Sequence, residues 1–176
     1  MNARGMIHGR FQPFHNGHLE YLKGASGRCE ELFVGITNPD PQRIKPEDSD
    51  PLRHLPESNP YSYVERLLMV KAAALDGRLD LARLHVIPFP VNEPELWPAY
   101  VPEDVTQFIR IFSDWGGTKV DRLREAGYEV VVLDEGAEKT VSGAEVRAAL
   151  REGGDWERLV PPRVAGVLRR LERTAV

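Results

Sequence analysis

The chain has 176 residues, a length that suits one domain with a full hydrophobic core. Hydrophobic residues make up 41% and charged residues 28%, and the net charge is -4, so we expect no nucleic-acid partner. The single cysteine, Cys29, excludes an internal disulfide and a zinc–thiolate cluster. The sequence shows neither a signal-peptide pattern nor an apolar run of about 20 residues that could cross a membrane. We therefore expect a cytoplasmic protein without a membrane partner.

Strands and helices are predicted to alternate along the chain. The first strand covers Met6 to His8 and ends at Gly9, and a helix with apolar residues at helical spacing starts near His18. The later elements are predicted as a strand over Leu32–Ile36, a helix over Tyr63–Leu75, strands over His85–Phe89 and Phe108–Phe112, a helix over Thr118–Glu125 closed by Gly127, a strand over Glu129–Leu133, and helices over Ala144–Glu152 and Arg163–Arg173.

The alternation predicts an α/β fold, a Rossmann-like five-stranded parallel sheet with helices on both faces, built by a single domain over residues 1–176. S-x-x-E capping boxes at residues 62–65 and 142–145 mark two helix starts. The polar, proline-rich stretch 37–58 is expected to be a long active-site loop or insertion, and 161–176 to carry a C-terminal helix. Parallel sheets bind ligands beyond the carboxyl ends of their strands, so the loop after Gly9 should line the site.

That loop contains the string GRFQPFHNGH, residues 9–18, with H-x-G-H at a strand-to-helix junction. Gly17 lets a phosphate approach the backbone, and the helix start offers free N–H groups and a positive dipole end. His15 and His18 can donate hydrogen bonds to one triphosphate, and Arg10 adds a planar positive charge. Taken alone, an H-x-x-H pair is more often a pair of ordinary loop residues. A zinc site is not expected, because no further Cys or His cluster completes four ligands.

The string resembles the signature of the nucleotidylyltransferase superfamily and, in its full length, the opening of archaeal-type nicotinamide-mononucleotide (NMN) adenylyltransferases. The superfamily also carries a late S-G/S-x-x-x-R segment, and VSGAEVR at 141–147 stands in that place. The resemblance implies transfer of a nucleoside monophosphate from a nucleoside triphosphate to a small acceptor, with release of pyrophosphate and with Mg²⁺ held through the triphosphate. It implies catalytic roles for Arg10, His15, His18 and Arg147, and nucleotide binding by Gly9, Phe11, Gly17, Asp114, Trp115, Ser142 and Gly143.

The nucleotide and the acceptor are left open by these motifs. The string GITNPDP at 35–41, the turn expected at 114–116 and Ala144 depart from the archaeal-type pattern. The GITNPDP string, the Arg53-His54 pair and the D-W-G turn at 114–116 resemble a sibling group that contains the phosphonoformate cytidylyltransferase of natural-product pathways. This favours CTP with a small phosphonate, and ATP with NMN is the alternative. Acceptor binding is then expected at Thr37, Asn38, Arg53, His54 and Trp97.

Three plainer interpretations stand beside these. Arg53 and His54 would equally suit a solvated loop, and Trp97 and Trp115 are more often packing residues than ligand platforms. A catalytically silent nucleotide-binding regulator is an alternative of another class, although the intact histidines and Arg147 speak against it. The resemblance also leaves a homo-oligomer open.

Overall fold

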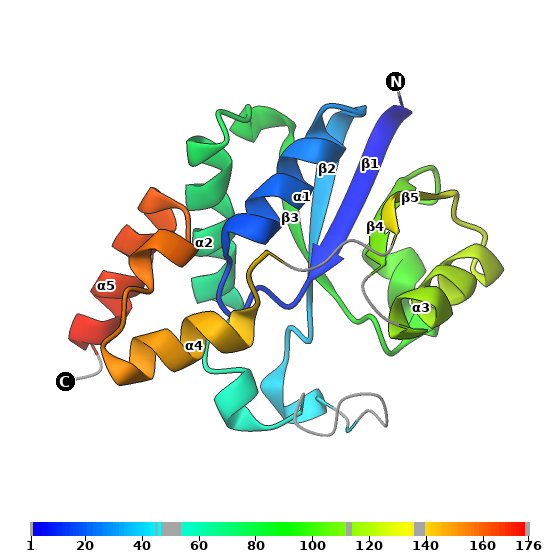
Figure 1. The fold of residues 1–176 in the computed structure, drawn as a ribbon. Coiled ribbons are helices and arrows are strands. Elements are labelled where there is room, and N and C mark those ends of the chain that lie inside the picture. Colours follow the sequence, from blue (N-terminus) through cyan, green and yellow to red (C-terminus); the bar gives the residue numbers. More distant parts are fainter. Residues whose placement is uncertain (1, 45, 47–53, 112–113, 136–139, 175–176) are drawn as a thin grey trace.

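The computed structural model of the protein describes residues 2–44, 46, 54–111, 114–135 and 140–174 (Figure 1). Five parallel strands form one sheet in the order β3-β2-β1-β4-β5, which confirms the predicted α/β architecture. Each predicted strand is present, with somewhat different ends. The strands are β1 (Asn2–Gly9), β2 (Cys29–Thr37), β3 (Leu84–Phe89), β4 (Thr106–Ile111) and β5 (Val130–Glu135).

Helices cover both faces of the sheet, as predicted. One core holds fully buried side chains of β1, α1, α2, α4 and α5, and a second core on the other face holds side chains of α3 and of the segment between β3 and β4. None of the helices in the described ranges is long and apolar enough to cross a bilayer. The helices are α1 (Asn16–Ser26), α2 (Tyr63–Asp76), α3 (Asp114–Glu125), α4 (Gly143–Glu152) and α5 (Pro162–Thr174).

Two helix starts differ from the prediction by more than one residue. Helix α1 begins at Asn16 rather than near His18, because His15 takes the extended N-cap conformation. Helix α3 begins at Asp114 rather than at Thr118, so the turn expected after the fourth strand is the first turn of a helix. The two glycines at 116 and 117 disfavour a helix locally, and an acidic residue at its start favours one.

Both predicted capping boxes are present. The Ser62 hydroxyl accepts from the main-chain N–H of Glu65 over 3.3 Å, and the Glu65 carboxylate accepts from the N–H of Ser62 over 2.7 Å. Within the stretch 37–58 the structure describes two short 3-10 helices, Pro41–Arg43 and Pro56–Ser58. The prediction for Arg53 falls outside the described residues.

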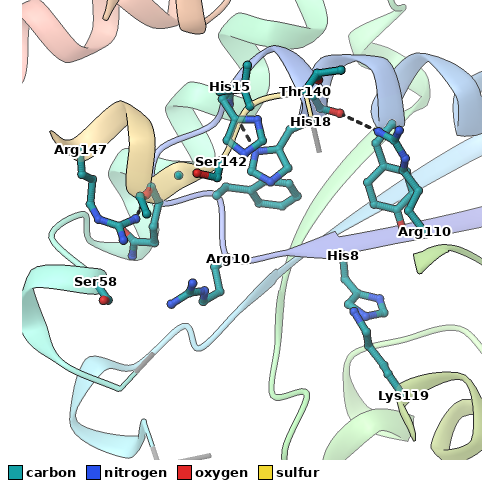
Figure 2. A pocket seen from close by; sticks show the side chains of 17 residues that line it. His8, Arg10, His15, His18, Ser58, Arg110, Lys119, Thr140, Ser142 and Arg147 are labelled. Carbon is teal, nitrogen blue, oxygen red and sulfur yellow. Dashed lines mark hydrogen bonds between the residues drawn. The ribbon is translucent and has the colours of Figure 1, made fainter. Parts of the chain in front are cut away.

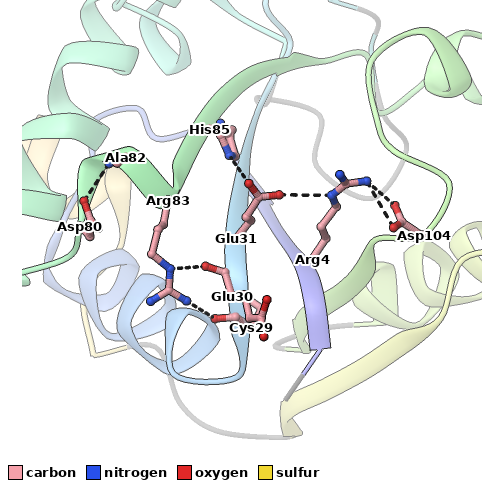
Figure 3. Close-up of polar contacts among 9 residues, drawn as sticks. All are labelled: Arg4, Cys29, Glu30, Glu31, Asp80, Ala82, Arg83, His85 and Asp104. Atoms are coloured by element: carbon pink, nitrogen blue, oxygen red, sulfur yellow. Dashed lines mark hydrogen bonds and ion pairs between the residues drawn. The ribbon is translucent and has the colours of Figure 1, made fainter.

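The amino end of the sheet carries acidic and basic side chains in pairs. Arg4 lies between Glu31 on β2, at 3.2 Å, and Asp104 before β4, at 3.0 Å (Figure 3). His85 on β3 reaches the second carboxylate oxygen of Glu31 at 3.6 Å. These pairs are exposed, so each contributes little to stability. At the carboxyl end of the sheet, by contrast, positively charged side chains gather around a cavity.

The strand order places a topological switch point at the carboxyl end of the sheet, between β1 and β4. β1 has β2 on one side and β4 on the other, so the connections that follow β1 and precede β4 leave the sheet on opposite faces. Ligands of open parallel sheets bind where the strand order reverses in this way. The loop after β1, which carries H-x-G-H, lies at this point.

Candidate active site

A cavity of about 480 Å³ opens at the carboxyl ends of β1 and β4, beside the starts of α1 and α4 (Figure 2). None of the 17 lining residues that the structure describes is an aspartate or a glutamate. Four carry a fixed positive charge and three are histidines, namely Arg10, Arg110, Lys119 and Arg147, and His8, His15 and His18. A wall of this charge favours a ligand with several negative charges.

The two histidines of the H-x-G-H loop lie against each other. Their ring centroids are 3.6 Å apart with an interplanar angle of 20°. The main-chain N–H of His15 donates to Nδ1 of His18 over 3.3 Å, as the dashed line in Figure 2 marks. Because Nδ1 of His18 accepts this hydrogen bond, its ring proton is on Nε2. His18 is therefore set to donate from Nε2 into the cavity.

Phe11 packs against the histidine pair through the His18 ring. Its side chain is 1% exposed, stacks on Phe14 with centroids 5.2 Å apart, and meets the His18 ring edge-to-face at 4.9 Å. Phe11 has a φ of 53°, a strained backbone for a bulky residue that the surrounding packing holds. A Cβ added at Gly9 would lie 3.0 Å from the Phe11 ring. Gly9 thus makes room for Phe11, although it does not line the cavity itself.

Gly17 is open toward the cavity. A Cβ at this position would meet His15 at 3.4 Å and the Thr140 hydroxyl at 3.5 Å, which are ordinary van der Waals contacts. The fold therefore tolerates a side chain at Gly17, and the added atom would occupy space that the cavity offers to a ligand. This is the arrangement expected for a close approach of phosphate to the backbone.

Helix α4 forms the opposite wall. The Ser142 hydroxyl accepts from the N–H of Glu145 over 3.2 Å, and the Glu145 carboxylate accepts from the N–H of Ser142 over 3.4 Å. The box caps the third amide of the helix and leaves the first-turn amides of Gly143 and Ala144 at the cavity wall. The starts of α1 and α4 thus direct two positive helix ends at one cavity.

Arg147 joins α4 to the H-x-G-H loop. Its Nη1 donates to the main-chain carbonyl of Gln12 over 2.5 Å. Gln12 in turn clamps Tyr61, donating to its carbonyl over 2.8 Å and accepting from its N–H over 2.9 Å. A Cβ at Gly143 would lie 2.8 Å from the same Gln12 carbonyl, so α4 approaches the loop closely only because residue 143 is glycine.

The charged side chains gather at two ends of the cavity. Arg10 and Arg147 lie at one end, near Ser58, and His8 and Lys119 lie at the other (Figure 2). Arg110 lies on the side of His8 and Lys119, where its Nη1 donates to the carbonyl of Gly17 over 3.1 Å.

His8, Arg110 and Lys119 line the cavity and were not among the predicted site residues. Arg110 interrupts the apolar run of β4 near its carboxyl end, and a charged residue at that place was the one available signal. It is held by Asp134 on β5, 2.9 Å away, so its position depends on the pairing of the two strands. Tyr21 is also in the wall and donates to the carbonyl of Phe108, and burial raises the pKa of its hydroxyl.

Several residues predicted to bind ligands lie elsewhere. Trp97 is 1% exposed, packs in the second core and donates from Nε1 to the Pro90 carbonyl over 3.0 Å. Thr37 is buried at the end of β2, and His54 does not line the cavity. Asp114 and Trp115 start helix α3, and their side chains are outside the described part of the structure.

Asn38 lines a smaller, separate cavity of about 230 Å³ at the ends of β2 and β3. Arg43 and Glu93 form an ion pair in its wall. Among the residues that the structure describes, no group of three or more His, Cys, Asp or Glu side chains is arranged to hold a metal ion.

Comparison with known proteins points to one family. Residues 6–149 match the family model described as cytidylyltransferase-like. The chain is similar to a phosphonoformate cytidylyltransferase of Streptomyces viridochromogenes, with 47% identity over 94% of this chain and 90% of that protein. It is also similar to a nicotinamide-nucleotide adenylyltransferase of Thermococcus kodakarensis, with 34% identity over 98% of this chain and 85% of that protein.

Solved structures show the same fold. A bifunctional NMN adenylyltransferase/ADP ribose pyrophosphatase from Francisella tularensis has a TM-score of 0.72 at 16% identity, covering 98% of this chain and 50% of that chain. The present chain thus spans half the length of that bifunctional protein. A nicotinic acid mononucleotide adenylyltransferase from Plasmodium falciparum has a TM-score of 0.56 at 13% identity, covering 97% and 96%.

Proposed function

The chain belongs to the cytidylyltransferase-like family, and from this premise we propose that it transfers CMP from CTP to a small phosphonate such as phosphonoformate, releasing pyrophosphate. The observation that carries the proposal is the cavity at the switch point, whose charged side chains are cationic without exception among its described lining residues. Its two helix N-termini and its imidazole pair suit a triphosphate.

The triphosphate would lie between α1 and α4. The amides of Gly143 and Ala144, the Nε2–H of His18 and the guanidinium of Arg147 would hold its oxygens. Gly17 would let the α-phosphate reach the start of α1. Pyrophosphate would leave toward Arg147, since that residue and the α4 amides stand at the same wall.

The reaction needs positioning and charge stabilisation more than a base. An ionised phosphonate oxygen of the acceptor would form a bond to the α-phosphorus. The bond from this phosphorus to the oxygen that bridges to the β-phosphorus would break, and its electron pair would leave with pyrophosphate. Because the acceptor oxygen is already ionised at neutral pH, no side chain has to remove a proton.

Magnesium would enter with the nucleotide. The described cavity wall offers no carboxylate, so phosphate oxygens and water would be its ligands while Arg10 and Arg147 hold the phosphates. When bound, the ion neutralises charge on the β- and γ-phosphates. Arg10 and Arg147 would add positive charge at the same phosphates.

Adenylyl transfer to NMN is the second candidate, and the relative with 34% identity supports it. The relative with 47% identity supports CTP and a phosphonate more strongly. The burial of Trp97 also argues against a nicotinamide ring stacking on that residue, since its indole is packed on Phe89 with centroids 5.3 Å apart.

A matrix of substrates tests the proposal. The protein would be incubated with magnesium and each of ATP, CTP, GTP and UTP, against phosphonoformate, methylphosphonate and NMN, and pyrophosphate release would be measured. Phosphorus NMR would identify the product. We expect turnover with CTP and phosphonoformate. Turnover with ATP and NMN alone would replace the proposal by the second candidate.

A further inference from the structure

We propose that His8 and Lys119 form an anion subsite for the acceptor's second charged group, a carboxylate next to the reacting phosphonate. The inference rests on the proposed function and names the acceptor class of that same site, a small dianion charged at both ends. Neither residue belongs to the H-x-G-H loop or to the S-G-x-x-x-R segment.

His8 and Lys119 converge from two different elements. His8 is 4% exposed near the end of β1, where its ring packs on Phe89 with centroids 5.0 Å apart. Lys119 is half-buried on α3. Figure 2 shows the two side chains pointing toward one another at the end of the cavity away from Arg147. An imidazole and an ammonium, in a wall whose described residues include no carboxylate, suit an anionic ligand group.

The geometry of transfer puts the acceptor at this end. Side chains alternate along β1, so His8 shares the sheet face of Met6, which packs in the core with α3. Ile7 faces the opposite core with α1 and α4, the helices that would hold the triphosphate. The attacking and leaving oxygens are roughly in line in phosphoryl transfer. If pyrophosphate leaves toward α4, the acceptor approaches from the side of α3.

The surroundings also limit the size of the acceptor. Trp97 lies beneath this face but is 1% exposed, and its Nε1 donates to the Pro90 carbonyl over 3.0 Å. An aromatic acceptor would have to displace this packing before stacking on the indole. A carboxylate bonded directly to the phosphonate phosphorus needs no such platform and places its charge close to the reacting group.

The test compares two acceptors in three variants. Phosphonoformate carries the carboxylate, and methylphosphonate lacks it. Lys119→Met and His8→Phe remove the proposed donors while keeping similar side-chain volume, and Arg122→Met removes an exposed charge from the same helix as a control. In the wild type, kcat/KM is expected to favour phosphonoformate.

Lys119→Met and His8→Phe should each raise the KM for phosphonoformate about 10-fold or more. The KM for CTP should stay within about 2-fold, and kcat/KM for methylphosphonate should not change, because the lost contact is absent with that acceptor. Arg122→Met should behave as the wild type. A rise in the KM for CTP, or equal losses with both acceptors, would overturn the subsite.

Binding separates this inference from the proposed function. Calorimetry with phosphonoformate, in the presence of the non-transferable α,β-methylene analogue of CTP, measures the affinity for the acceptor without turnover. Wild-type protein that shows no transfer to either acceptor defeats the proposed function. Binding of phosphonoformate that weakens in Lys119→Met but not in Arg122→Met supports the subsite even then. Equal binding in all variants defeats it whether or not transfer occurs.

Discussion

The guanidinium of Arg66 donates from Nη1 to the main-chain carbonyl of Arg10 over 3.0 Å, and this contact ties α2 to the active-site loop. Arg66 is 2% exposed, and its other hydrogen bonds reach the carbonyls of Ser62 at 3.2 Å, Thr37 at 2.7 Å and Asn38 at 2.9 Å. One buried cation thus joins the ends of β1 and β2 to the start of α2. Burial lowers the pKa of Arg66 to about 10, so it remains charged at neutral pH.

Arg66→Met should destabilise the protein by about 3–5 kcal/mol, because it leaves several buried carbonyls without donors. Urea unfolding followed by circular dichroism measures the loss, and Lys71→Met, exposed on the same helix, serves as control. Because the folded-state pKa is lowered, any pH effect of Arg66 begins only as the pH rises through about 10, where the folded form releases its proton first and stability increases. The difference between wild type and Arg66→Met should therefore be equal at pH 6 and pH 8.5. A difference that changes across this range would contradict the assignment.

His18→Asn should lower kcat about 10²–10³-fold with little loss of stability. The asparagine carbonyl oxygen can replace Nδ1 and still accept from the N–H of His15, but nothing replaces the Nε2–H donor. His18→Gln places an amide N–H near the Nε2 position and should recover part of the rate. Initial rates of pyrophosphate release together with thermal unfolding test both variants. A near-normal rate in His18→Asn would remove His18 from the catalytic group.

Alanine at Gly17 and at Gly143 should have opposite effects on the fold. Gly17→Ala should keep or slightly raise stability and still lower kcat/KM about 10²-fold, because its Cβ projects into the cavity. Gly143→Ala should lower both activity and stability, the latter by about 1–3 kcal/mol, because its Cβ meets the Gln12 carbonyl at 2.8 Å. Gly24→Ala, with open space around it in α1, is the matched control. Equal stability losses at 17 and 143 would show that the fold, and not a ligand, requires both glycines.

Arg78→Gly should stabilise the protein by about 0.5–1 kcal/mol. Arg78 lies two residues after the end of α2 and has a φ of 58°, and the N–H of Leu79 donates back to the Ala74 carbonyl over 2.9 Å. Glycine adopts this left-handed backbone without the steric cost of a side chain. Arg78→Ala keeps the Cβ and should show no gain, which separates the backbone effect from the loss of charge. Chemical denaturation of the wild type, Arg78→Gly and Arg78→Ala decides between the backbone effect and the charge effect.

The Cys29 thiol should resist modification in the folded protein. It is 1% exposed, and burial raises its pKa above the ordinary value of about 8.5. The unfolded chain therefore releases the thiol proton at a lower pH, and the contribution of Cys29 to stability falls as the pH rises above about 8.5. Reaction with Ellman's reagent at pH 8 should be slow in buffer and fast in urea. Rapid reaction without denaturant would show that the core around β2 opens readily.

Short sequence patterns predicted several helix starts and the loop that carries the site histidines. The capping boxes at Ser62 and Ser142 each link residues three apart, so the sequence alone indicates where α2 and α4 begin. The H-x-G-H string likewise lies within one strand-to-helix junction, and the structure brings His15 and His18 to the same cavity as Arg147. The start of α3 escaped prediction because the glycines at 116 and 117 weaken its helical pattern.

By itself, then, the sequence determined the alternation of strands and helices, the loop that carries the histidines and the chemistry of a phosphate site, because these features depend on neighbours a few residues apart. Only the tertiary structure decided that His8, Arg110 and Lys119 share the cavity and that Trp97 lies in the core. Those outcomes follow from the strand order β3-β2-β1-β4-β5 and from the face on which each side chain emerges. Both are set by packing between segments far apart in the chain, which no short-range pattern records.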